Sequence, residues 1–122
     1  MDITTEAVRV GLGMAQAQAW AASANIAGVD VPGAKVYRTD FSEALNALDA
    51  ASRDVAGAGK ALSGMSYERI TDGIEKDPSR SADQVRLDDQ VAQLNIANTT
   101  YRTLINGLSR HYALMQLAIK GE

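Results

Sequence analysis

The chain has 122 residues and a formal net charge of −3, and 46% of its residues are hydrophobic. This hydrophobic fraction supports a folded core, and the length is that of one domain. The acidic balance argues against a nucleic-acid-binding protein, whose surface would carry a basic face. The sequence has no cysteine and only one histidine, His111, so thiolate and multi-histidine metal sites are excluded, and we expect no cofactor.

The first predicted element is an alanine-rich helix that ends near Ala27. Small and apolar residues recur every three or four positions, as in a helix that packs along a seam. The seam consists of Val8, Leu12, Ala15, Ala19, Ala22 and Ile26, and a second stripe of Val10, Gly13, Ala17, Trp20 and Ala24. Such small side chains let another backbone come close but bury little area.

Residues 10–29 carry no charge, which raises the question of a membrane segment. Polar residues interrupt this stretch, and alanine and glycine supply most of its apolar character, so it is a poor spanning helix. Asp2 and Glu6 stand where a secretory signal would be positively charged. We therefore expect neither a membrane span nor a cleaved signal.

A turn is predicted at Val31-Pro32-Gly33, because proline followed by glycine fits the centre of a type II turn. Asp40 then resembles a helix cap with Glu43 as its reciprocal partner. The following helix should end near Ala56, and its packed face should consist of Phe41, Leu45, Leu48, Ser52 and Val55.

Residues 65–84 are polar and weakly patterned. Within them a short strand is predicted at residues 66–70, and Gly73 and Pro78 indicate turns.

The C-terminal third has the strongest pattern, a helix over about residues 87–120. Its seam is spaced alternately by four and three residues: Leu87, Val91, Leu94, Asn98, Tyr101, Ile105, Leu108, Tyr112, Met115 and Ile119. Such a helix is roughly 50 Å long, whereas a compact domain of this size is about 35 Å across. Leu114 and Leu117 make the last turns apolar on nearly all sides, which predicts that this surface meets other chains, a membrane or a detergent-like partner.

The predicted fold is mainly α and elongated, with long N- and C-terminal helices pairing as a coiled-coil-like hairpin. Residues 1–27 and 85–122 form the paired helices. Residues 28–84 form an extended turn, a short helix and an irregular middle segment. No spacing places a nucleophile or an orienting acid near His111, so we do not expect an enzyme.

The segment NIAGVDVPGAKVYRTDF, residues 25–41, resembles the signature of the flagellar basal-body rod proteins, closest to the proximal-rod type. Nine residues match without a gap: Asn25, Ile26, Ala27, Asp30, Pro32, Gly33, Lys35, Asp40 and Phe41. The C-terminal part is also similar, at Val85, Leu87, Asp88, Tyr101, Ala118, Ile119 and Gly121. The resemblance covers about residues 3–45 and 83–122, and the middle does not match.

The resemblance implies a structural subunit of the periplasm-spanning rod, exported through the flagellar type III channel without a cleaved signal. Its partners would be copies of itself, other rod subunits, the inner-membrane ring or its adaptor, and the export apparatus. It implies neither a nucleic-acid ligand nor a small-molecule substrate. The alternative is a cytoplasmic helical adaptor or export chaperone of a type III secretion system.

Two sets of residues are candidates for function on this basis. The signature turn comprises Asn25, Ile26, Asp30, Pro32, Gly33, Asp40 and Phe41. The helix-pairing and subunit interface comprises Leu12, Ala15, Ala19, Ala22, Leu94, Asn98, Tyr101, Ile105, Leu108, Tyr112, Leu114, Met115, Leu117 and Ile119.

Overall fold

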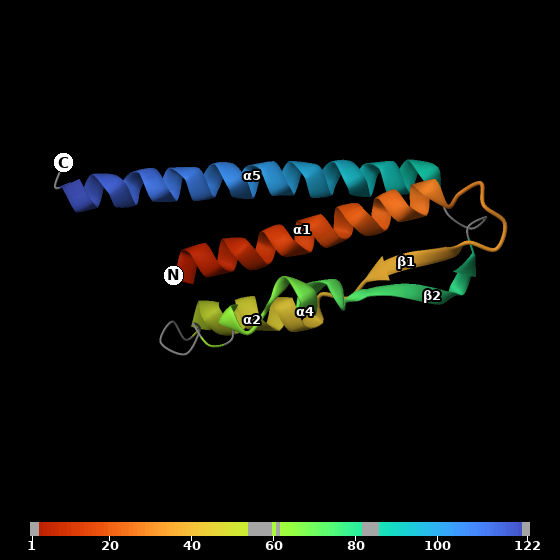
Figure 1. Ribbon diagram of the computed structural model, residues 1–122, viewed down its shortest axis with the longest axis horizontal. Coiled ribbons are helices and arrows are strands. Elements are labelled where there is room, and N and C mark those ends of the chain that lie inside the picture. The colour runs from red at the N-terminus through yellow and green to blue at the C-terminus, as the bar shows by residue number, and fades with distance from the viewer. Residues whose placement is uncertain (1–2, 54–59, 61, 82–85, 121–122) are drawn as a thin grey trace.

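The computed structural model describes residues 3–53, 60, 62–81 and 86–120, and it is mainly helical, as predicted. In chain order its elements are α1 (Ile3–Ala27), β1 (Lys35–Thr39), α2 (Ser42–Arg53), α4 (Tyr67–Thr71), β2 (Ile74–Ser81) and α5 (Leu87–Lys120). The two long helices pack against each other, and α1 lies between α5 and the smaller elements (Figure 1). The predicted pairing of the terminal helices is confirmed.

The helices α1 and α5 run antiparallel along most of the length of α1. Asn25 Nδ2 donates a hydrogen bond to Gln90 Oε1 at 3.0 Å. A Cβ added to Gly11 would lie 3.1 Å from a methyl group of Leu104. Because Gly11 is 14 residues from Asn25, and Leu104 is 14 residues from Gln90, the two contacts share one register. Small residues on α1 thus let α5 approach closely.

The other side of α1 forms the hydrophobic core with the middle segment. The buried cluster comprises Val10, Ala17, Ala44, Ala47, Ala51, Leu62, Met65 and Ile70. A Cβ on Gly13 would lie only 2.8 Å from Ile70 Cδ1, so α1 and α4 are in close contact. Arg9 extends from α1 and donates to the carbonyl oxygens of Leu62 and Met65, each at 2.7 Å. The second predicted stripe therefore packs on the middle segment.

Helix α2 differs in detail from its prediction. Its buried face consists of Ala44, Ala47 and Ala51, whereas Leu45 is 53% exposed. Leu45 was therefore wrongly placed, because the three alanines, and not Leu45, face the hydrophobic core. The predicted end of this helix, with Val55 and Ala56, lies outside the described residues.

The middle segment contains more regular structure than the sequence indicated. The strand predicted at residues 66–70 is wrong, because Tyr67–Thr71 form helix α4, and the Ser66 hydroxyl accepts the Arg69 backbone N–H at 3.2 Å. The strands are instead β1 and β2, which pair antiparallel. The register shifts where Lys35 faces Ser81 and Val36 faces Asp77. The turn predicted at Pro78 is wrong, because Pro78 falls in this irregular part of β2, where proline is tolerated.

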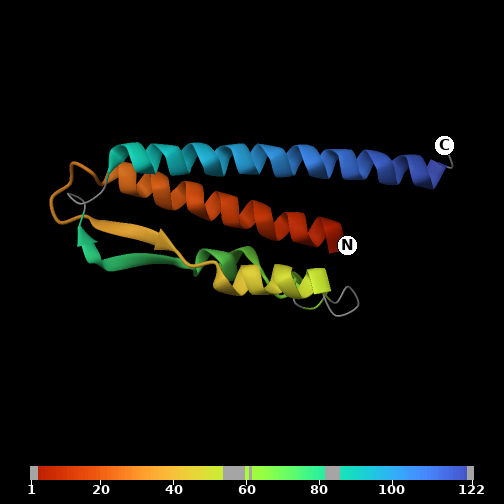
Figure 2. The same ribbon diagram turned by 180° about the vertical axis from the view of Figure 1, so that it is seen from behind.

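The molecule is elongated, and the C-terminal end of α5 projects past the start of α1 (Figures 1 and 2). Helix α2 lies along the N-terminal half of α1, and the two strands lie along its C-terminal half (Figure 2). In the part of the chain that the structure describes, neither long helix has a stretch apolar enough to cross a bilayer.

Candidate functional site

Asn25, the first residue of the signature, joins three elements. Its side chain is 5% exposed and sits at the C-terminal end of α1. Its Oδ1 accepts the backbone N–H of Tyr37 at 2.7 Å, and its Nδ2 donates to the Tyr37 carbonyl at 2.9 Å. The same Nδ2 donates to Gln90 of α5. An amide can satisfy the backbone of β1 in this way because it offers both a donor and an acceptor.

The turn after α1 exposes most of its side chains. The backbone N–H of Val31 donates to the Gly28 carbonyl, and that of Ala34 donates to the Val31 carbonyl. Gly33 has φ of +78°, as the predicted type II turn requires. Asp30, Val31 and Pro32 are exposed, whereas Ile26 is half-buried. The turn therefore presents a short acidic and apolar tip at one end of the molecule.

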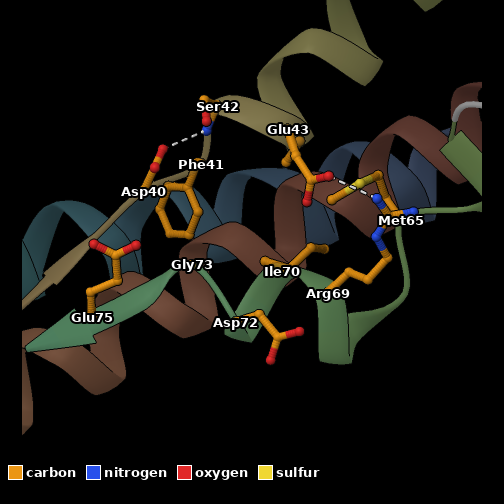
Figure 3. A pocket seen from close by; sticks show the side chains of 11 residues that line it. Asp40, Phe41, Ser42, Glu43, Met65, Arg69, Ile70, Asp72, Gly73 and Glu75 are labelled. Atoms are coloured by element: carbon orange, nitrogen blue, oxygen red, sulfur yellow. Dashed lines mark hydrogen bonds and ion pairs between the residues drawn. The ribbon is translucent and has the colours of Figure 1, made fainter.

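Asp40 and Phe41 line a pocket of about 260 Å³ between α2, α4 and the start of β2 (Figure 3). Asp40 Oδ1 accepts the Ser42 backbone N–H at 3.0 Å, as a helix cap does. Glu43 is not the reciprocal partner that we predicted. Its carboxylate pairs with Arg69 at 2.8 Å, and the backbone N–H of Asp40 donates to the Gly73 carbonyl instead.

The carboxylates of this pocket have structural roles. Hydrogen bonds from the backbone and side chain of Ser42 lower the pKa of Asp40, and the charge of Arg38 lowers it further. Glu75 pairs with Arg38 at 3.1 Å. Within the described residues, no group of three or more His, Cys, Asp or Glu side chains is placed to hold a metal ion. The arrangement explains how the signature segment is held against α4 and β2.

The face of α5 that packs on α1 differs from the predicted seam. We call it the inner face, and its residues are buried or half-buried: Gln90, Leu94, Ala97, Tyr101, Leu104, Leu108 and His111. Leu94, Tyr101 and Leu108 were expected there. Gln90, Ala97, Leu104 and His111 were missed, because three of the four are not strongly apolar. The buried Asn25–Gln90 pair is polar on both helices, so no hydrophobic pattern could reveal it.

Five of the remaining predicted residues lie on what we call the outer stripe of α5. It consists of Val91, Asn98, Ile105, Tyr112 and Ile119, which recur every seven residues and are all exposed. They are not buried against α1 in the single chain, because the helix is rotated about its axis toward the inner face, and their place in a subunit interface stays a prediction. The exposed fractions are 42% for Val91, 38% for Ile105 and 47% for Tyr112. A heptad repeat that is apolar at all positions but Asn98 thus remains exposed in the single chain.

The last two turns of α5 lack a counterpart in α1. With Gly11 opposite Leu104, Ile3 lies opposite about residue 112, so residues 113–120 form an overhang of roughly 12 Å. Leu114 is 66% exposed, Leu117 47% and Ile119 82%. Met115 is also exposed, at 38%. An apolar helix end of this kind is usually covered by a partner.

The candidate residues of α1 are all at least half-buried. Ala15 and Ala22 are buried, whereas Leu12 and Ala19 are half-buried. Arg9 was not a candidate, although it contacts two backbone carbonyls of the middle segment.

Comparison with known proteins leaves the chain without an assigned relative. No family model matches it, and neither a curated protein nor a solved structure does.

Proposed function

We propose that this protein is a structural subunit of the bacterial flagellar basal-body rod, assembling with copies of itself and with other rod subunits. The observation that carries the proposal is the unpaired outer surface of α5. Its outer stripe repeats every seven residues, and the overhang exposes Leu114, Leu117 and Ile119. A protein that functions alone gains nothing from this much exposed apolar helix.

The heptad spacing favours a helix as the partner. Side chains that recur every seven residues along one stripe form the seam of a coiled coil. Asn98 is the one polar member of the stripe, and a single polar seam residue fixes the register between helices at a cost in stability. Asn98 is exposed at the flank of the inner face, where it is available to fix a register with a second chain.

The resemblance of residues 25–41 to the rod-protein signature supports the same proposal. In this chain Asn25 holds β1 to the end of α1, and Gly33 takes the positive φ of a turn. These contacts would give each subunit a fixed direction in which the middle segment leaves the paired helices. The paired helices would then form the inner tube, and the middle segment would face outward.

The experiment replaces Leu117 by lysine in cells where the variant is the only copy. No acidic residue lies between Asp89 and Glu122, and Arg102, Arg110 and Lys120 lie on the same helix. A lysine buried between two such helices would therefore be an unpaired charge, which costs several kcal/mol per subunit. We expect synthesis and export of the variant to persist, while basal bodies recovered from these cells lack a rod and the cells do not swim.

Leu45→Lys is the matched control, because Leu45 is similarly exposed in the single chain but lies on α2. We expect its cells to swim. Intact rods that contain the Leu117→Lys subunit would show that the overhang is exposed in the assembly and would refute the proposal.

A further inference from the structure

Residues from four elements line a second pocket, near the middle of the molecule. It is lined by Trp20 of α1, Tyr37 of β1, Tyr67 and Thr71 of α4, and Ile74 of β2, and its volume is about 390 Å³. Trp20 packs edge-on against Tyr37, with ring centroids 5.0 Å apart. Trp20 is 51% exposed and Tyr67 is 54% exposed. The pocket is thus an apolar, aromatic surface that is open to a ligand.

A lysine stands at the edge of this pocket. Lys76 faces Tyr37 across the two strands, so both side chains lie on the same face of the sheet. Its Nζ lies 5.9 Å from the Tyr37 ring centroid. Among the described residues, no carboxylate forms an ion pair with Lys76. The pocket therefore combines an aromatic floor with one positive charge that no described carboxylate pairs with.

The tip of the turn has the complementary features. Val31 is 52% exposed, and its neighbours Asp30 and Pro32 are exposed too. Asp30 forms no ion pair with any described residue. Aromatic-lined grooves accept proline and its apolar neighbours, since such a segment loses little entropy on binding. The tip thus offers one negative charge, one valine and one proline in three successive residues.

We propose that the Asp30-Val31-Pro32 tip of one copy binds the aromatic pocket of a neighbouring copy, with Asp30 paired to Lys76. The occupant is a second copy because the turn between α1 and β1 lies at the end of the molecule, whereas α4, which lines the pocket, lies nearer its middle (Figure 1). The two surfaces differ, so the contact joins copies head to tail and continues along a filament. The inference rests on the proposed function and adds a second contact, separate from the outer surface of α5.

Cross-linking of the full-length protein tests the contact, because the sequence contains no cysteine. Protein with Val31→Cys is mixed with protein carrying Tyr67→Cys, and a short bis-maleimide joins thiols that meet. The control pair is Val31→Cys with Arg53→Cys, because Arg53 is exposed at the far end of α2. We expect the mixed dimer to form well above the control, with the linked peptides identified by mass spectrometry. Equal yields in both pairs would overturn the inference.

A charge exchange provides a second measurement that does not depend on the cysteines. Asp30→Lys and Lys76→Glu should each weaken self-association by up to about fivefold, the size of an exposed ion pair. The double variant should restore it. If neither change matters and the double variant is unaltered, the tip does not pair with Lys76.

The outcomes distinguish this inference from the proposed function. If the cross-link fails while the wild-type protein still assembles and Leu117→Lys prevents assembly, the tip contact is wrong and the rod proposal stands. If the wild-type protein does not assemble under any condition, both fail.

Discussion

Replacing Asn25 by alanine should destabilise the isolated chain more than any other single loss of a polar side chain at the end of α1. The substitution removes both hydrogen bonds to the Tyr37 backbone and the bond to Gln90 Oε1. Since Asn25 is 5% exposed, water does not freely replace these partners. The strand β1 and the start of α5 would lose their common attachment to α1.

The magnitude follows from the three bonds. Each intramolecular hydrogen bond contributes about 0.5–1.5 kcal/mol net, and a buried group left unpaired costs about 1–3 kcal/mol. The Tyr37 N–H belongs to a two-stranded sheet and can recover some hydration. We therefore expect a loss of about 2–4 kcal/mol, out of a total of about 5–15 kcal/mol for a protein of ordinary stability.

Urea unfolding followed by tryptophan emission measures this loss. Trp20 is the only tryptophan and contacts Tyr37, so its emission reports on the affected region. Asn95→Ala is the matched control, because Asn95 is exposed and also lies within a helix. The two changes have the same effect on helix propensity. A free energy of unfolding that falls no further for Asn25→Ala than for Asn95→Ala would refute the assignment of the three bonds.

Three other predictions concern the turn, the cap and the overhang. Gly33→Val should lower the free energy of unfolding by about 1–3 kcal/mol, and Gly33→Asn should lower it less. A Cβ at this position meets no atom within 4 Å, so the cost comes from the positive φ of +78°, which asparagine tolerates better than valine. Equal urea midpoints for the two variants would contradict this. The pKa of Asp40 in the folded protein is lowered from 3.8. The Asp40 carboxylate therefore stabilises the fold above pH 3.8, and this stabilisation is lost as the pH falls through the lower pKa of the folded state. The difference in unfolding free energy between wild type and Asp40→Asn should accordingly shrink in acid, and a constant difference would count against the cap. In dilute protein, amide hydrogens of residues 113–120 should exchange faster than those of residues 90–104, and strong protection of the overhang would mean that the monomer already covers it.

The sequence predicted the long elements because their patterns are long. The bounds of α5 agree with the prediction, since an uninterrupted alternation of four and three over ten positions is typical of a helix and Asp88 marks its start. The end of α1 was also predicted, because glycine at position 28 suits a helix terminus.

The details that failed depend on contacts between elements. The predicted seam of α5 had the correct spacing, but the face of α5 that packs on α1 is rotated about the helix axis relative to it. The reason is that α1 is rich in alanine, so Gln90 and Ala97 of α5 can pack against it. The strands were missed because β2 contains charged residues and a proline, and its pairing with β1 depends on Asn25 holding the Tyr37 backbone in place. Neither effect appears within a single segment of sequence.

The central claim is that the outer surface of α5 joins copies of this protein. Sedimentation velocity of the purified chain over a range of concentrations tests it directly, with Leu117→Lys and Leu45→Lys run beside the wild type. We expect wild type and Leu45→Lys to grow into larger species as concentration rises, while Leu117→Lys remains a monomer of unchanged unfolding free energy. The claim would be contradicted if the wild-type protein stayed monomeric, or if it formed a closed dimer that Leu117→Lys did not disrupt. The closed dimer would favour the helical adaptor instead.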